Sequence, residues 1–345
     1  MKTLAAILVE TGRPLELVDL EIPPLKPGQV LVEIAYSGVC HTQVGEWLGW
    51  RGPDAFLPHC LGHEGCGTVV DIAPGVSRCV PGDEVILSWI KAAGQDIAGT
   101  TYQWDHRTVN AGGVTTFSRH AVISENRASR LPAGMPRRAA ALVGCAAATG
   151  FGSILNTAQV ELGESVVIFG VGGIGLCALS AAAATGANPI AAVDTRSQRL
   201  EVAQQLGATH IIDASVGDTL SALRAICSGG WNVAIEATGQ PRVMEMSLAA
   251  VRARGGRAVV VGNAKFGVSL TLDPREFNQG KRLLGTWGGD TVPDRDFPKY
   301  CDWIASGKTP VESILDREYA LPDINAALED LHAGRCTRPL INMNL

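Results

Sequence analysis

Apolar and polar positions along the chain follow two different rhythms. From residue 1 to about 147, short apolar runs alternate with turn residues, and Pro-Gly pairs at 27–28 and 81–82 end two of them. This pattern is typical of a domain rich in short strands. From about 148 to 287, short β-branched runs alternate with longer Ala- and Leu-rich runs. That second pattern predicts strands that are each followed by a helix, and therefore a parallel sheet.

The second pattern resolves into individual elements. Strands are expected at 164–170, 189–194, 210–213, 231–238, 257–263 and 283–286, and helices at 173–185, 197–207, 216–227 and 240–252. Strands and helices in this order predict an α/β fold with a doubly wound parallel sheet. After residue 287, helices near 297–306 and 322–332 are expected to return the chain to the first domain.

A glycine-rich turn joins the first strand and the first helix of this sheet. The apolar run at 164–169 leads into GVGGIG at 170–175, and the next strand ends in Asp194, 19 residues beyond Gly175. In dinucleotide-binding folds the glycines let the backbone approach the pyrophosphate, the helix N-terminus supplies N–H groups, and the acid binds the ribose hydroxyls. The sequence therefore predicts a Rossmann domain.

The acid at the strand end also bears on the choice of cofactor. Asp194 would repel the 2′-phosphate of NADP, although Arg196 and Arg199 follow closely in the chain. Because the aspartate stands where ribose binding is decided, NAD is the expected cofactor.

Three glycine-containing motifs carry candidate metal ligands. They are Cys40 in GVCHTQ, His63 in LGHEGCG and Cys145 in VGCAAATG. Two thiolates and an imidazole are three of the four ligands of tetrahedral Zn²⁺, and an open fourth position is typical of a catalytic zinc site. Each motif is also typical of a turn at a strand end, where backbones approach closely.

The composition excludes several classes of protein. The 345 residues carry 29 Lys and Arg against 34 Asp and Glu, a formal net charge of −5, so no nucleic-acid partner is expected. No apolar span of about 18 residues and no signal-peptide pattern occur, so no membrane partner is expected. Nine scattered cysteines indicate reduced thiols and a cytoplasmic location.

The chain resembles the zinc-dependent medium-chain alcohol dehydrogenases. The resemblance rests on PGQVLVEIAYSGVCHT, LGHEGCG, PGDEV, VGCAAATG, GVGGIG and HAGRCTRP, which follow the family's order over nearly the whole length. It implies a GroES-like, strand-rich catalytic domain at 1–147 and 288–345 and an NAD-binding Rossmann domain at 148–287. It also implies one catalytic zinc per chain, a homodimer or homotetramer, and hydride transfer between a small alcohol or carbonyl substrate and NAD.

The resemblance also implies roles for single residues. Cys40, His63 and Cys145 would be the zinc ligands, and Glu64 would lie behind the metal and bind it transiently. Thr42 would pass the alcohol proton outward, because its hydroxyl both donates and accepts. The residues implied for the substrate pocket are Thr42, Trp89 and Trp287. Those implied for the cofactor are His41, Thr149, Gly170, Gly172, Gly173, Ile174, Gly175, Asp194, Arg199, Thr238, Val261 and Arg338, and His41 is also expected to act in catalysis.

Several positions depart from the family pattern. No cysteine occurs between Cys79 and Cys145, where many relatives bind a structural zinc on four cysteines, so a single zinc is expected. Asp105 and His106 are a weak alternative site in that segment. Further departures lie in or near the active-site motifs. Gln43 replaces a common aspartate, and Gly45 replaces a relay histidine. His59-Cys60, just ahead of His63, is polar where relatives are usually aliphatic.

Other functions stay open at this point. A dehydrogenase of polyols, sugars or cyclitols would carry the same zinc site, and only its substrate pocket would differ. A catalytically silent NAD-binding protein is a remote alternative. A zinc-free quinone reductase is disfavoured because Cys40, His63 and Cys145 are all present.

Overall fold

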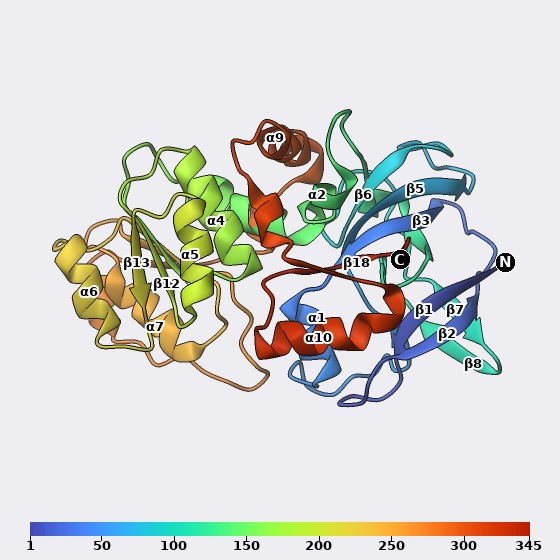
Figure 1. The fold of residues 1–345 in the computed structure, drawn as a ribbon, viewed down its shortest axis with the longest axis horizontal. Helices are drawn as coiled ribbons and strands as arrows, with labels where there is room; N and C mark the ends of the chain where they lie inside the picture. The colour runs from blue at the N-terminus through green and yellow to red at the C-terminus, as the bar shows by residue number, and fades with distance from the viewer. The chain divides into compact units, whose positions relative to one another are not determined.

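The computed structural model describes residues 1–345 and divides into two compact units (Figure 1). The first unit comprises Met1–Cys145, Val292–Ala305 and Leu315–Leu345, and the second comprises Ala146–Thr291 and Ser306–Ile314. Residues 306–314 belong to the second unit because Val311 and Ile314, in a short 3-10 helix, are buried and pack against a helix of that unit. The sequence alone placed this segment with the catalytic domain.

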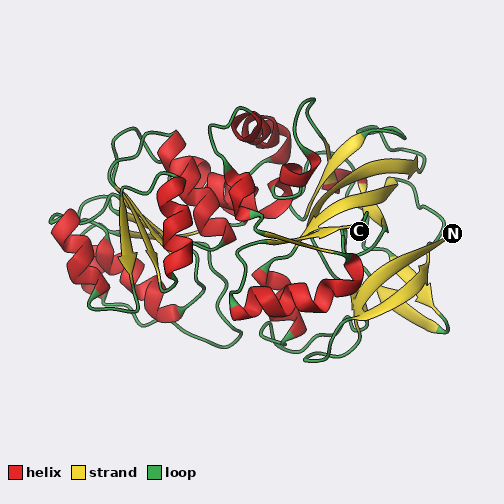
Figure 2. Ribbon diagram, viewed as in Figure 1, coloured by secondary structure: helices red, strands yellow, loops and turns green.

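The first unit contains two sheets (Figure 2). A closed barrel consists of β1 (Lys2–Leu8), β2 (Glu16–Glu21), β7 (Thr101–Trp104), β8 (Arg107–Asn110) and β4 (His59–Cys60). The second sheet has the order β10 (Ala128–Arg130), β6 (Glu84–Ser88), β5 (Glu64–Ile72), β3 (Gln29–Gly38), β18 (Pro339–Asn342) and β17 (Arg317–Tyr319), with β9 (His120–Ser124) also paired to β3. The helices are α1 (His41–Trp47), α2 (Arg137–Ala140), α9 (Pro293–Ala305) and α10 (Ile324–Ala333).

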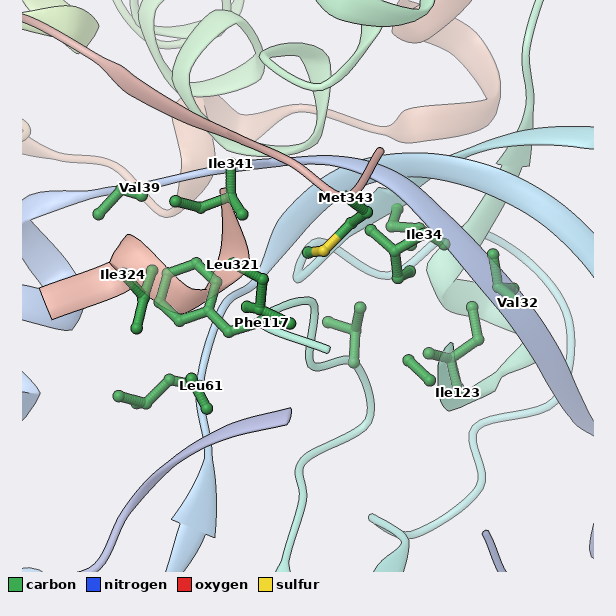
Figure 3. Close-up of a cluster of buried hydrophobic side chains, with 14 of the residues drawn as sticks. Val32, Ile34, Val39, Leu61, Phe117, Ile123, Leu321, Ile324, Ile341 and Met343 are labelled. Carbon is green, nitrogen blue, oxygen red and sulfur yellow. The ribbon is translucent and has the colours of Figure 1, made fainter. Parts of the chain in front are cut away.

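The largest core of the first unit lies between its strands and α10. Val30, Val32 and Ile34 of β3 alternate with residues on the other face, as the two-residue period of a strand requires. Helix α10 buries four residues on one side, at the spacing of an amphipathic helix: Ile324, Ala327, Leu328 and Leu331. Figure 3 shows Ile324 and Leu321 close to Phe117 and Ile341 in this core.

The cysteine-free segment between Cys79 and Cys145 includes a hairpin of the barrel. Strands β7 and β8 pair across a turn at Asp105, which has a φ of 52°. Tyr102 of β7 is buried, and its hydroxyl accepts a hydrogen bond from the backbone N–H of Val122 at 2.7 Å. Burial and hydrogen bonding therefore hold this segment without thiolate ligands.

The second unit is a six-stranded parallel sheet with its helices. The strand order is β13 (His210–Asp213), β12 (Ile190–Asp194), β11 (Val166–Phe169), β14 (Val233–Glu236), β15 (Arg257–Val260) and β16 (Arg282–Gly285). Its helices are α3 (Ala148–Gly152), α4 (Gly173–Ala184), α5 (Ser197–Gln205), α6 (Thr219–Ile226), α7 (Pro241–Ala250) and α8 (Pro274–Asn278).

The predicted α/β fold class is confirmed, because all six expected strands form and pair in parallel. The order 3-2-1-4-5-6 reverses between β11 and β14, and dinucleotides bind at such a reversal in this class of sheet. The short helix α8 and the helical stretch from Val143 to Thr157 were not predicted. None of the helices combines the length and the apolar character that crossing a membrane requires.

Candidate active site

Three predicted metal ligands meet in the first unit. The ligand atoms of Cys40, His63 and Cys145 all lie within 4.8 Å of one another, and the Nε2 atom of His63 is 3.2 Å from the Cys145 sulfur. Cys40 precedes α1, His63 precedes β5, and Cys145 lies in a helical turn at Val143–Ala147. Two thiols and an imidazole at this spacing fit a tetrahedral zinc with one open position.

Glycines beside these ligands let the backbones approach. A Cβ atom at Gly144 would collide with the carbonyl oxygen of Leu87, and one at Gly38 would collide with the Glu64 carboxylate. Any larger residue would therefore displace the turn that carries Cys145 or the strand end that precedes Cys40.

Each of the three ligands shifts the pKa of its neighbours. The Cys145 thiol donates toward the Cys40 sulfur, and this lowers the pKa of Cys40 well below its ordinary value and raises that of Cys145. Burial works against a charged imidazole, but the hydrogen bond and charge of Cys40 outweigh it and raise the pKa of His63. The lowered pKa favours the thiolate form of Cys40, and the thiolate is the form that binds metals.

Glu64 and Arg338 form a buried ion pair beside the ligands. Glu64 is fully buried, Arg338 is 3% exposed, and the guanidinium donates to the carboxylate. Desolvation opposes the charge, yet the attraction of Glu64, Cys40 and Cys145 raises the pKa of Arg338 above its ordinary value. The sequence assigned Arg338 to the cofactor and Glu64 to the metal. It did not indicate that the two residues contact each other.

Replacing Arg338 with methionine is expected to lower the free energy of unfolding by about 3–5 kcal/mol, because Glu64 would stay buried without its counter-ion. The double variant Glu64→Gln/Arg338→Met should recover much of this loss, since no uncompensated charge remains. Arg335→Met is the matched control, because its exposed pair with Asp330 should contribute only about 0–1 kcal/mol. Denaturant unfolding measures all four proteins, and equal midpoints for wild type and Arg338→Met would contradict the expectation.

Gln43 connects two of the ligands. Its side-chain oxygen accepts a hydrogen bond from the backbone N–H of Cys40 at 2.8 Å, and its nitrogen lies 2.5 Å from the Nδ1 atom of His63. The first contact is part of a capping box at the start of α1. Helix capping and ligand orientation therefore depend on the same side chain.

The other predicted catalytic residues lie around the ligands. The Thr42 hydroxyl is 3.6 Å from the Cys40 sulfur, and His41 is exposed as the first residue of α1. The Trp89 ring meets the His63 ring edge-on, with centroids 6.5 Å apart. Trp287 belongs to the second unit and is 73% exposed there.

The predicted glycine-rich turn lies between β11 and α4 in the second unit. Gly170 has a φ of 83°, and a Cβ atom at Gly175 would collide with the Gly170 carbonyl oxygen. Asp194 at the end of β12 accepts hydrogen bonds from the N–H of Val171 at 2.9 Å and from two residues that follow it. The acid therefore holds the glycine turn against its own strand, with the Arg199 guanidinium 3.9 Å away.

The remaining predicted cofactor residues also lie in this unit. Thr149 is 6% exposed, and its hydroxyl has no hydrogen-bond partner in the protein. A buried hydroxyl without a partner is unfavourable, so this atom suits a contact with a bound cofactor. Val261 follows β15, and its N–H donates to the Glu236 carbonyl oxygen at 2.8 Å.

Glu236 is a buried acid beside the predicted cofactor residue Thr238, and the sequence reasoning did not single it out. It is fully buried at the end of β14, and its carboxylate accepts from the N–H of Thr238 at 2.7 Å and of Gly239 at 3.0 Å. Burial raises its pKa, although these hydrogen bonds favour the charged form. The available signal was an acid directly after the apolar run VAI, as at Asp194.

A cavity of about 740 Å³ in the first unit reaches His63 and Gln43. Two pairs of side chains line it: Arg51 forms an ion pair with Glu46 at 2.9 Å, and the His59 ring forms a hydrogen bond with Asp54 at 2.8 Å. Burial raises the pKa of Glu46, against the attraction of His63 and Arg51. Of the three predicted substrate-pocket residues, none lines this cavity.

The chain matches known proteins over nearly its whole length. Residues 26–133 match the alcohol dehydrogenase GroES-like domain, and residues 173–306 match the zinc-binding dehydrogenase family. The chain is 30% identical to the alcohol dehydrogenase class-3 of Cereibacter sphaeroides and to the S-(hydroxymethyl)glutathione dehydrogenase of Paracoccus denitrificans, covering 99% of this chain and all of each relative. The crystal structure of benzyl alcohol dehydrogenase from Acinetobacter calcoaceticus has 30% identity and a TM-score of 0.91 over 99% of both chains.

Proposed function

Since the chain belongs to the zinc-dependent medium-chain alcohol dehydrogenases, it is an oxidoreductase that transfers a hydride between an alcohol and NAD, and we propose that Cys40, His63 and Cys145 hold its zinc. The observation that carries this proposal is that all three ligand atoms lie within 4.8 Å of one another. A zinc ion held in this way supplies a Lewis acid that polarises the substrate oxygen. Glu64 lies beside the ligands as the buried partner of Arg338, and its transient binding of the metal stays a prediction.

The proton of the alcohol leaves first through the Thr42 hydroxyl. Thr42 offers a hydroxyl close to Cys40, and such a group both accepts and donates a proton. Gly45 has no side chain to continue the transfer, so water carries the proton beyond Thr42. His41 is exposed at the start of α1 and is able to meet an anionic group of the cofactor.

NAD binding belongs to the second unit in this proposal, and the strand-rich first unit carries the chemistry. The turn from Gly170 to Gly175 supplies close backbone approach, and the N-terminus of α4 supplies N–H groups for the pyrophosphate. The Asp194 carboxylate favours ribose hydroxyls over a 2′-phosphate. Arg199, Thr238, Val261 and Arg338 stay predicted cofactor contacts, as does Thr149, whose buried hydroxyl lacks a protein partner.

The cavity favours the second candidate function, a dehydrogenase of polyols or sugars. Its lining includes the Arg51–Glu46 ion pair, the hydrogen-bonded pair of His59 and Asp54, the amide of Asn110 and the hydroxyls of Thr100, Thr101 and Thr115. These groups suit a substrate with several hydroxyls better than an aromatic ring, because the ring would leave them without hydrogen bonds. The Arg51 guanidinium already faces the Glu46 carboxylate, so the cavity also offers poor recognition of an anionic substrate such as a glutathione adduct.

A substrate screen tests the function and the substrate class together. Primary, secondary, polyhydroxylated and aromatic alcohols and S-(hydroxymethyl)glutathione are offered with NAD and NADP in parallel. We expect the highest kcat/KM with NAD and a neutral polyhydroxylated alcohol. Glu46→Leu should shift the preference toward benzyl alcohol by about tenfold, which corresponds to roughly 1.4 kcal/mol.

Two outcomes would contradict these expectations at different levels. Turnover of no alcohol with either cofactor would defeat the assignment of the reaction. Benzyl alcohol or the glutathione adduct as the best substrate would defeat only the polar substrate class. A homodimer or homotetramer and a cytoplasmic location stay predictions from the sequence.

A further inference from the structure

The side-chain amide of Gln43 contacts two groups of the metal ligands, the backbone N–H of Cys40 and the Nδ1 atom of His63. Building on the zinc ligands proposed above, we propose that Gln43 keeps metal-free His63 in the tautomer with its proton on Nε2. The site consequently binds zinc less tightly than it would with a carboxylate at this position. This assigns a positioning residue that sets the metal affinity of this chain.

The oxygen and the nitrogen of the Gln43 amide face different neighbours, Cys40 and His63. An amide offers one accepting oxygen and one donating NH₂ group. The Cys40 N–H is always a donor, and it takes the oxygen of Gln43 at 2.8 Å. The NH₂ group therefore faces the Nδ1 atom of His63, at 2.5 Å. Gln43 is 1% exposed, so solvent replaces neither contact.

This arrangement decides which nitrogen of His63 carries the proton. The NH₂ group donates only if Nδ1 accepts, and a neutral ring that accepts at Nδ1 has its proton on Nε2. In that tautomer Nε2–H points at the Cys145 sulfur, 3.2 Å away, as an N–H···S hydrogen bond. Of the two neutral tautomers, only this one gives both ring nitrogens a hydrogen-bond partner.

Metal binding needs the opposite tautomer. The nitrogen that faces Cys145 must offer its lone pair, so the proton must move to Nδ1, where it meets the NH₂ group of Gln43. Turning the amide over gives His63 an acceptor but sets the NH₂ group against the Cys40 N–H. Either orientation of the amide leaves two donors face to face. A carboxylate at this position would accept from both.

The test is the zinc affinity and the tautomer of the full-length protein. Gln43→Glu keeps the length of the side chain and the acceptor for the Cys40 N–H, and it supplies an acceptor for Nδ1. We expect this variant to bind zinc about 10–100-fold more tightly in competition with a chelator, the range typical of groups that orient metal ligands. Gln103→Glu is the control: it adds the same charge on the exposed face of β7, where Gln103 bonds Thr108, and should leave the affinity unchanged.

Nitrogen-15 chemical shifts of His63 in the metal-free protein give a readout independent of activity and of added charge. At a pH where the ring is neutral, we expect the proton on Nε2 in the wild type and on Nδ1 in Gln43→Glu. A wild-type proton on Nδ1, or unchanged zinc affinity in Gln43→Glu, would overturn the proposal. Retention of zinc by Cys145→Ser would instead defeat the ligand assignment, so the two failures are distinguishable.

Discussion

Replacing Cys145 with serine is expected to remove zinc and abolish alcohol turnover while leaving NAD binding largely intact. Serine keeps the shape of the side chain, but its hydroxyl does not ionise to a metal ligand as a thiol does. Only two ligands would remain, Cys40 and His63. The glycine turn and Asp194 belong to the other compact unit and keep their own hydrogen bonds. Elemental analysis, steady-state kinetics and calorimetric titration with NAD measure the three quantities.

The matched control is Cys227→Ser. Cys227 is half-buried at the end of α6 and lies outside the ligand cluster, so this variant should keep its zinc and its turnover. Cys40→Ser should behave like Cys145→Ser. Near-normal turnover in either ligand variant would show that the assignment of the metal site is wrong.

Thr42→Val is expected to lower turnover by about 10²–10⁴-fold, the usual contribution of a general acid–base group. The valine keeps the volume of threonine and removes only its hydroxyl, which lies 3.6 Å from the Cys40 sulfur. Thr42→Ser restores a hydroxyl and should stay close to the wild-type rate. Gly45 has no side chain that could take over the proton transfer. Rates with protiated and deuterated alcohol show whether hydride transfer limits each variant.

Thr108→Val serves as the control for this substitution, because Thr108 is exposed on β8 and its hydroxyl contacts the surface residue Gln103. It should keep the wild-type rate. A Thr42→Val enzyme that turns over alcohol nearly as fast as the wild type, with a full deuterium isotope effect, would exclude Thr42 as the proton carrier.

Features that depend on neighbouring residues could be predicted from the sequence. The strand, the glycine turn and the helix from Val166 to Ala184 follow from local apolar patterning and from the freedom of glycine at positive φ. The alternation of such units implies the parallel sheet, because strands joined by helices pair in parallel. The cysteine and histidine motifs specified the ligand trio, since zinc limits both the type and the number of its ligands.

The tertiary structure decided the contacts between distant positions. Glu64 and Arg338 are 274 positions apart, and only the pairing of β3 with both β5 and β18 in one sheet brings the two segments together. The sequence identifies Gln43 as unusual, but the conflict at its amide depends on the direction of two side chains and one backbone N–H. Sequence patterns specify which residue types are present and which face they occupy. The donors and acceptors that meet in the buried site depend on the packing of whole elements, which no local pattern encodes.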